Sequence, residues 1–260
     1  MSVNIILFAL LGLSLGSFIN AWVWRVKTSK SIVRGRSMCP HCKHQLEWYD
    51  NIPLLSFMLL RAKCRYCKKP ISWQYPIVEL STALLFAALY LHFSPSTGYG
   101  WLELGLWCLA SVFLVSAFVY DLKWMLLPDR FTLPAVAIGL LLVVLAGTSS
   151  GWAAVVPQLL AAVVVGAMYF GLWYFSGGRL LGDGDIRLAV AMGLLLLVPQ
   201  LFVAVLVAYV TGALVGVYLM TQKGKTRTTA VPMGPFLIFG LYFGLFFGSE
   251  IARWYMTFVW

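Results

Sequence analysis

Four of the five cysteines form two pairs with the spacing of a metal-binding site. Cys39 and Cys42 make one Cys-x-x-Cys pair and Cys64 and Cys67 make the other, with 21 residues between the pairs, one more than is usual. Four thiolates can bind one tetrahedral ion and leave no open position for water, so we predict a structural zinc site rather than a catalytic one. The alternatives are two disulfides, which a reducing cytoplasm disfavours, and a redox pair, which would not need a second copy nearby.

Carboxylates give the second chemical signal. Four of the nine acidic residues lie in two short segments, each beside a long apolar run. Asp121 and Asp129 are in the first segment, and Asp183 and Asp185 are in the second. A carboxylate at the edge of an apolar span is costly unless it is paired or hydrogen-bonded, so this clustering favours a functional site.

Asp121 and Asp185 are the two residues best placed for aspartic-protease chemistry. In such a dyad an ionised carboxylate activates water, and its protonated partner polarises the scissile carbonyl. Asp185 is expected at the N-terminus of a helix, which favours the charged form, and Asp121 at the C-terminus of another, which favours the neutral form. We therefore predict that Asp185 begins as the base and Asp121 as the acid, within a pair that titrates as a unit.

The residues around this pair are predicted to support the substrate or the active site. They are Asp129, Gly182, Asp183, Gly184 and Arg187. Two of the acidic residues have structural alternatives: Asp129 follows a proline and can be a helix N-cap, and Asp183 can be a loop or cap residue between two glycines. Gly184 permits unusual backbone angles directly before Asp185.

The composition places these residues in a membrane protein. Hydrophobic residues make up 61% of the 260 residues and charged residues 11%, against about 45–50% and about 25% in soluble globular proteins. These values exclude a soluble enzyme, a disordered tail and a disulfide-rich secreted module. We expect an all-α polytopic membrane protein with about eight transmembrane helices and a small cytoplasmic zinc-binding loop domain.

Apolar runs give the approximate positions of the spans. They cover residues 4–24, 76–93, 102–120, 131–147, 153–175, 186–198, 200–221 and 233–256. No barrel-like alternation is visible, so helices are predicted. The first run ends in aromatic residues rather than small ones and lacks a basic start, so we expect it to remain as a helix rather than a cleaved signal. Gly12 with Gly16, and Gly212 with Gly216, have the spacing of close helix packing.

Basic residues predict the orientation of the chain. Eleven of the 19 Lys and Arg fall between Arg25 and Lys69, and threading eight spans with this loop in the cytoplasm puts all but Arg253 on the same side. Positive charge is retained in the cytoplasm, so we predict an outside N-terminus, with residues 25–75 and the carboxylates on the cytoplasmic side. The net charge of +10 is then topological, and no nucleic-acid partner is expected.

With these motifs together, the chain resembles the bacterial prepilin peptidases, or type IV leader peptidases, over nearly its whole length. Besides the two cysteine pairs, the matching segments are 15–20, 46–53, 75–80, 121–129, 182–185 and 232–237. The resemblance implies an inner-membrane aspartic endopeptidase that removes the short basic leader of type IV prepilins or type II secretion pseudopilins, with Asp121 and Asp185 as the catalytic pair. At Arg187 the family commonly has lysine, so the charge is retained while the hydrogen-bond geometry differs.

The resemblance also implies a second activity and a domain plan. Many members methylate the new N-terminal amine with S-adenosylmethionine, an activity associated with the zinc-bearing region, whereas the sequence shows no Rossmann-type glycine fingerprint. The expected division is a first transmembrane helix at 1–24, a cytoplasmic zinc-binding domain at 25–75 and a membrane aspartic-peptidase domain at 76–260. Expected partners are prepilin or pseudopilin substrates and membrane lipid.

Three other functions remain open at this level. A presenilin-like intramembrane protease shares the Gly-x-Gly-Asp element but would place its aspartates mid-helix and has no counterpart of the cysteine loop. A transporter with interfacial carboxylates would be expected to bind ions near the midplane, often between related halves, and no internal repeat is visible. A zinc-dependent membrane scaffold would have no catalysis.

Overall fold

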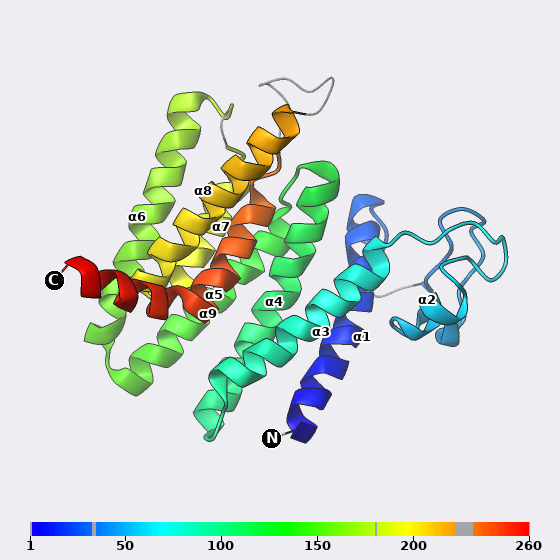
Figure 1. Cartoon of the computed structure of the whole chain (residues 1–260), viewed down its shortest axis with the longest axis horizontal. Coiled ribbons are helices and arrows are strands. Elements are labelled where there is room, and N and C mark those ends of the chain that lie inside the picture. Colours follow the sequence, from blue (N-terminus) through cyan, green and yellow to red (C-terminus); the bar gives the residue numbers. More distant parts are fainter. Residues whose placement is uncertain (1, 33–34, 180, 222–230, 260) are drawn as a thin grey trace. The chain divides into compact units, whose positions relative to one another are not determined.

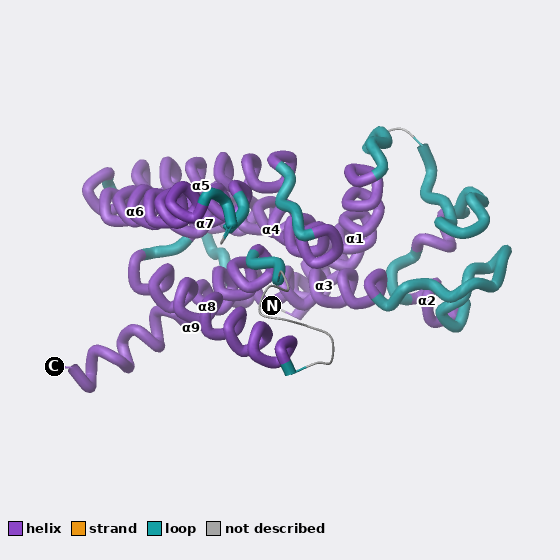
Figure 2. Tube along the Cα trace, turned by 90° about the horizontal axis from the view of Figure 1, so that it is seen from above, coloured by secondary structure: helices purple, strands orange, loops and turns teal. Residues whose placement is uncertain are grey.

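The computed structural model describes residues 2–32, 35–179, 181–221 and 231–259. The regular secondary structure in this part of the chain is almost entirely helical, and Figure 2 shows helices joined by loops. The β-type pairing within the described residues consists of two isolated bridges, Met38 with Gln45 and Lys63 with Pro70. Two compact units, Met1–Cys108 and Leu109–Trp260, make up the chain and are described separately.

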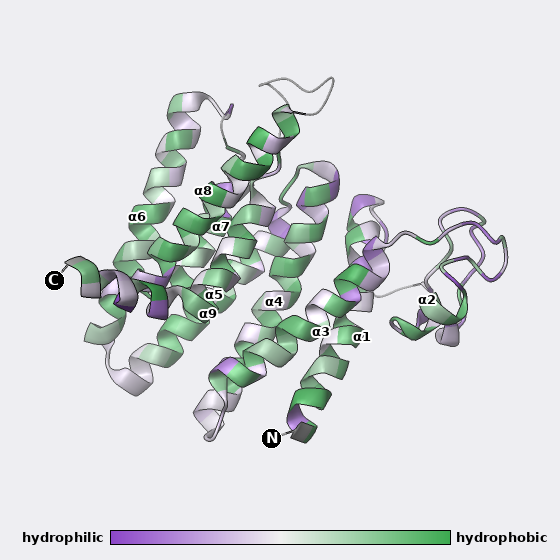
Figure 3. Cartoon of the chain, viewed as in Figure 1, coloured by the Kyte–Doolittle hydropathy of each residue, from purple (hydrophilic) through white to green (hydrophobic). Residues whose placement is uncertain are grey.

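Among the described residues, seven helices are long and apolar enough to cross a membrane, which confirms the all-α membrane fold. They are α1 (Ser2–Lys27), α3 (Gln74–Phe93), α4 (Gly98–Trp124), α5 (Asp129–Ser150), α6 (Trp152–Ser176), α8 (Val198–Met220) and α9 (Gly234–Val259). Most of their exposed side chains are large and apolar, and Figure 3 shows the hydrophobic colouring along them. Such surfaces require lipid around them.

The sixth apolar run folds differently from the other seven. Residues 186–198 contribute to α7 (Asp183–Leu195), which has only 13 residues. That length spans about 20 Å, less than the hydrocarbon thickness of about 30 Å. The chain leaves the helix at Leu196, whose backbone is extended, and Pro199 lies in the first turn of α8. Helices α5 and α6 pack along α7, so its apolar residues are buried in protein rather than exposed to lipid.

In the N-terminal unit, α1 packs closely on α3. A Cβ added to Gly12 would lie 2.6 Å from the carbonyl oxygen of Thr82, and one added to Gly16 would lie 2.7 Å from Cα of Glu79. The predicted packing role of these two glycines is therefore confirmed. The predicted packing role is wrong for Gly216. A Cβ added to Gly216 would have no atom of the described residues within 4 Å.

In the C-terminal unit, α8 and α9 lie side by side (Figure 1). Leu237, Leu241 and Leu245 of α9 are buried at a spacing of four residues, which places them on one helix face. Gly240 and Gly244 of the same helix meet the backbone and side chain of α8, with added Cβ atoms at 2.3–2.7 Å. This close contact holds the start of α9, which reaches the carboxylates described below.

Candidate active site and metal centre

The four paired cysteines converge in the N-terminal unit. The Sγ atoms of Cys39, Cys42, Cys64 and Cys67 all lie within 4.8 Å of one another, and Cys39 and Cys67 are 3.9 Å apart. Zn–S bonds of about 2.3 Å in a tetrahedron require sulfurs about 3.8 Å apart. All the cysteines are free thiols, so the disulfide alternative is excluded in this structure. The cluster therefore has the donors and the spacing of a metal site.

The two cysteine pairs lie on two hairpins with the same backbone design. In each, the N–H of the first cysteine donates to the carbonyl five residues later, and the residue after the second cysteine is left-handed: Lys43 at φ 62° and Lys68 at φ 59°. The matching bonds are Cys39 N to His44 O at 3.0 Å and Cys64 N to Lys69 O at 2.8 Å. The sequence reveals this repeat only as Cys-x-x-Cys-Lys, found twice.

The thiols of the cluster differ in acidity. Burial raises the pKa of the Cys39 thiol, but hydrogen bonds from the backbone N–H groups of Cys42 and His41 outweigh burial and lower the pKa to about 7. At Cys67 the backbone N–H of Lys69 lowers the pKa, while burial and the neighbouring thiols raise it to about 11. Cys39 is thus a ready metal ligand near neutral pH, because only the thiolate binds.

Asp50 ties the second hairpin to the turn before it. Its side chain is 2% exposed, and its Oδ1 accepts a bond from Nε of Arg65 at 2.8 Å. Its Oδ2 accepts bonds from the Tyr66 hydroxyl and the Glu47 backbone N–H, both at 3.3 Å. Arg65 and Tyr66 are the two residues between Cys64 and Cys67, so Asp50 orients the metal-binding turn. Sequence reasoning assigned Asp50 no role.

In the C-terminal unit, Asp121 and Asp185 are both buried at helix ends. Asp121 is 4% exposed in the last turn of α4, and Asp185 is 7% exposed in the first turn of α7. Both carboxyl groups lie beside Leu127: an added Cβ would lie 2.4 Å from this residue at Gly184, which directly precedes Asp185, and 3.2 Å from it at Gly234, whose N–H binds Asp121. The structure thus brings together two acidic side chains that are 64 positions apart.

Each of the two carboxyl groups is held by one backbone N–H. Oδ2 of Asp121 accepts from Gly234 at 3.0 Å, and Oδ2 of Asp185 accepts from Gly182 at 3.0 Å, as the reciprocal half of a capping box. Oδ1 of Asp185 is buried and has no hydrogen-bond partner among the described residues. Because a buried acceptor without a partner is costly, this atom is a site for a water molecule or a substrate group.

Leu127, in the loop between α4 and α5, packs against two glycines that lead into the carboxylates. A Cβ on Gly184 would lie 2.4 Å from Cβ of Leu127, and one on Gly234 would lie 3.2 Å from its Cδ1. Gly184 is helical and not among the described glycines with positive φ. A glycine is therefore needed at position 184 because Leu127 lies too close for a side chain there. The expectation of unusual backbone angles at Gly184 is wrong.

Arg187 joins the remaining residues of the site. Its guanidinium contacts Asp129 at 2.6 Å and Asp183 at 3.1 Å, linking the first turns of α5 and α7. The N-cap interpretation of Asp129 is not supported, since α5 begins at Asp129, with Pro128 as its N-cap and no side-chain capping bond. Gly182 is the N-cap of α7, and Asp183 is the first residue of that helix.

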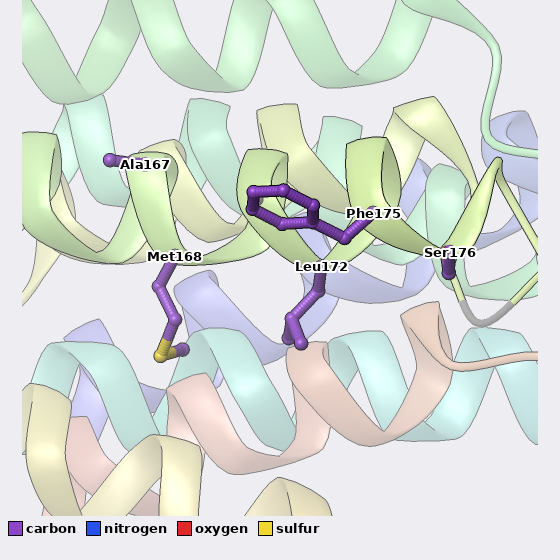
Figure 4. A pocket seen from close by; sticks show the side chains of 6 residues that line it. Ala167, Met168, Leu172, Phe175 and Ser176 are labelled. Atoms are coloured by element: carbon purple, nitrogen blue, oxygen red, sulfur yellow. The ribbon is translucent and has the colours of Figure 1, made fainter.

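A pocket of about 340 Å³ lies on α6. Figure 4 shows the side chains of Met168 and Leu172 extending from the same side of this helix. The lining consists of Ala167, Met168, Gly171, Leu172, Phe175 and Ser176. These six residues include no titratable group, so the pocket itself offers no acid–base chemistry.

Comparisons with known proteins cover most of the chain. A family model described as Bacterial Peptidase A24 N-terminal domain matches residues 10–93, and one described as Type IV leader peptidase family matches residues 108–217. The chain is 37% identical over 222 residues to a "Prepilin leader peptidase/N-methyltransferase" of Aeromonas hydrophila, covering 85% of this chain and 75% of that protein. It is 32% identical to one of Xanthomonas campestris pv. campestris, covering 95% and 93%. No solved structure matches.

Proposed function

Because the chain belongs to the type IV leader peptidase family, we propose that it is a membrane aspartic endopeptidase that removes the basic leader from type IV prepilins or pseudopilins. The observation that carries this proposal is the geometry of the two buried carboxyl groups. Each has one oxygen fixed by a backbone N–H, and Oδ1 of Asp185 is left without a partner among the described residues. Such an arrangement suits a carboxylate that holds and deprotonates water.

In the proposed reaction Asp185 is the base and Asp121 the acid. Asp185 takes a proton from a water molecule while the oxygen of that water attacks the scissile carbonyl carbon. Protonated Asp121 donates a hydrogen bond to the carbonyl oxygen. The C–N bond of the tetrahedral intermediate then breaks as the leaving amine takes the proton that Asp185 had removed from water, which returns Asp185 to its ionised form. The helix positions support these roles, since a negative charge is favoured in the first turn of α7 and disfavoured in the last turn of α4. Backbone hydrogen bonds alone do not separate the roles, because each carboxyl accepts one.

Charge and topology support a cytoplasmic location for the reaction. The segment from Arg25 to Lys69 carries 11 of the 19 basic residues, and positive charge is retained in the cytoplasm. We propose that the protein lies in the bacterial inner membrane with its N-terminus outside and its carboxylates at the cytoplasmic interface. The apolar helix of a prepilin would then lie in the bilayer and its basic leader in the cytoplasm, with the scissile bond at the depth of Asp121 and Asp185.

The cysteine cluster is proposed to hold structural zinc. Four thiols that converge on two preformed hairpins match the ligand set of a closed zinc site, which supplies folding energy rather than an open coordination position. We also propose that the enzyme methylates the new N-terminal amine with S-adenosylmethionine. The support for this second activity is the name of the relatives, "Prepilin leader peptidase/N-methyltransferase".

Cleavage of a prepilin by the purified protein in detergent tests the peptidase. We expect Asp121→Asn and Asp185→Asn each to lower the cleavage rate by roughly 10²–10⁴-fold or more, because each removes a group that transfers or holds a proton. Glu250→Gln, which neutralises an exposed carboxylate of α9, is the matched control and is expected to cleave normally. Full cleavage by either aspartate variant would refute the dyad. The mass of the product, with and without the methyl donor, tests methylation separately.

A further inference from the structure

The short helix α2 (Leu55–Leu59) presents an apolar surface that its own unit does not cover. Leu55, Met58 and Leu59 are 49%, 71% and 72% exposed. Their spacing of three and four residues puts them on one side of the helix. We name these three residues the α2 face. Figure 3 shows α2 in hydrophobic colours beside hydrophilic loop segments of the same unit.

A partly buried hydrogen bond fixes the depth of α2 relative to a membrane span. The backbone N–H of Leu54, the residue that precedes α2, donates to Oε2 of Glu79 at 2.9 Å. Glu79 is 6% exposed and is the sixth residue of α3, a candidate span. At 1.5 Å per residue it lies about 8 Å along α3 from the helix start. The start of α2 is therefore held beside the second turn of a membrane-crossing helix.

An aromatic contact fixes the other part of α2 near the same end of α3. The ring of Phe57 packs on the ring of Trp73, with centroids 5.1 Å apart and an interplanar angle of 63°. Trp73 directly precedes α3 and is 68% exposed. Tryptophan at the end of a span is typical of the membrane–water interface.

The residues that follow α2 complete an interfacial pattern. Arg61 and Lys63 are exposed and come directly after the helix and its C-cap. Basic side chains beside an apolar helix surface are attracted by anionic headgroups, and their stems reach past the apolar layer to the charged surface. Apolar side chains, a tryptophan and basic residues at the level of a span end together match a helix lying in the interface.

We propose that the α2 face is embedded in the lipid headgroup and upper acyl region of the leaflet from which the loop emerges. The occupant of this surface is lipid, because the Leu54–Glu79 bond and the Phe57–Trp73 contact hold it at bilayer depth. The loop that carries the cysteine cluster is thereby seated on the membrane at α2, in addition to its two chain connections. This proposal rests on the membrane spans and is independent of the proposed peptidase activity.

Depth-dependent fluorescence quenching of the full-length protein in nanodiscs containing anionic lipid tests this placement. An environment-sensitive fluorescent amino acid replaces Met58 in one protein and Gln45, an exposed residue of the first cysteine hairpin, in another. We expect the probe at Met58 to lose fluorescence to lipids carrying a nitroxide near the headgroup and to be protected from aqueous iodide. The probe at Gln45 is expected to show the reverse.

Two variants of the anchoring residue sharpen the test. Glu79→Ala removes the acceptor of the Leu54 N–H, so quenching by nitroxide lipids at position 58 is expected to fall. Glu79→Gln keeps an acceptor oxygen, so most of the quenching is expected to remain. Retention of bound metal by both variants checks that the cysteine hairpins are folded.

Two results would overturn the proposal. Equal quenching of both probes by iodide would show that the α2 face is in water. Protection of the Met58 probe from both iodide and nitroxide lipids would show that protein, either the rest of this chain or a second copy, covers the face.

Discussion

The backbone N–H of Gly234 donates a hydrogen bond of 3.0 Å to Oδ2 of Asp121, across 113 positions of the chain. The first residue of α9 thus contacts the last turn of α4. A side chain is not tolerated at this point, since a Cβ on Gly234 would lie 2.7 Å from the same carboxylate oxygen. The orientation of one member of the proposed dyad therefore depends on a glycine near the end of the sequence.

Gly234→Ala is expected to impair cleavage while the protein still inserts into the membrane. The added methyl group must displace the Asp121 carboxylate, and a misplacement of about 1 Å at a reacting group can lower a rate by about 10²-fold. Prepilin cleavage by purified protein measures the effect. Gly216→Ala is the control, because a Cβ there meets open space; equal activity of the two variants would contradict the proposed role of Gly234.

Arg187→Lys is expected to retain most of the peptidase activity. Both ion pairs of Arg187 are partly solvent-exposed, with side-chain exposures of 59% for Asp129 and 68% for Asp183. Such pairs contribute about 1 kcal/mol or less, and lysine keeps the charge but not the forked geometry. Arg187→Glu places a third carboxylate beside two others, so we expect a larger loss. Measurement of kcat/KM for prepilin cleavage compares the two variants. An Arg187→Lys variant as inactive as Asp185→Asn would contradict the expectation that lysine is tolerated.

The metal affinity of the cysteine cluster is expected to rise with pH, with a change of slope near pH 7. The pKa of Cys39 is lowered to about 7, so below that pH metal binding must release the Cys39 proton, whereas above it the thiolate is already present. The number of protons released by Cys39 on binding therefore falls from one to zero as pH rises through 7. Competition with a chelator at several pH values measures this slope.

A slope that stays constant through pH 7 would contradict the lowered pKa of Cys39. Cys108 provides an internal comparison, because it is buried in α4, away from the four cysteines that converge. Cys108→Ala is expected to leave the curve unchanged, whereas Cys39→Ser is expected to weaken binding at every pH.

Gly16→Leu is expected to destabilise the N-terminal unit. A side chain at this position collides with the α3 backbone, since even its Cβ would lie 2.7 Å from Cα of Glu79. Overpacking of this kind costs about 1–3 kcal/mol. Thermal unfolding in detergent gives the comparison with Gly105→Leu, where a Cβ meets no atom within 4 Å. An unchanged midpoint for the Gly16 variant, or an equal fall for both variants, would contradict the importance of close packing at Gly16.

The sequence was most informative where chemistry depends on local spacing. Two Cys-x-x-Cys pairs predicted a convergence that the structure contains, because each pair presents two sulfurs from one turn. Charge at a helix end similarly indicated Asp121 and Asp185, and both lie in terminal turns. The domain boundaries predicted at 24/25 and 75/76 stay predictions, since compact packing does not report which segment carries which activity.

Features that depend on contacts between distant segments were not predictable. Leu127 fills the space left by the missing side chains of Gly184 and Gly234. These three residues come from three separate segments, and no single segment has a sequence pattern that indicates the contact. The short α7 was indistinguishable from a span by apolarity, because burial in protein and burial in lipid select the same residue types. The ion pair of Asp129 was not foreseen because its partner, Arg187, lies 58 positions away, and the supporting role expected of Asp129 stays a prediction.

The matching cysteine hairpins have a consequence for how the loop assembles. Every backbone hydrogen bond within each hairpin joins residues fewer than ten positions apart, so the backbone of each hairpin can form early, as short-range contacts do. A single event remains, the closure of the intervening 21-residue segment, whose entropic cost grows only slowly with length. If an ion binds one hairpin first, the closure of this segment brings the other two cysteines to it, so we expect that closure to complete the site.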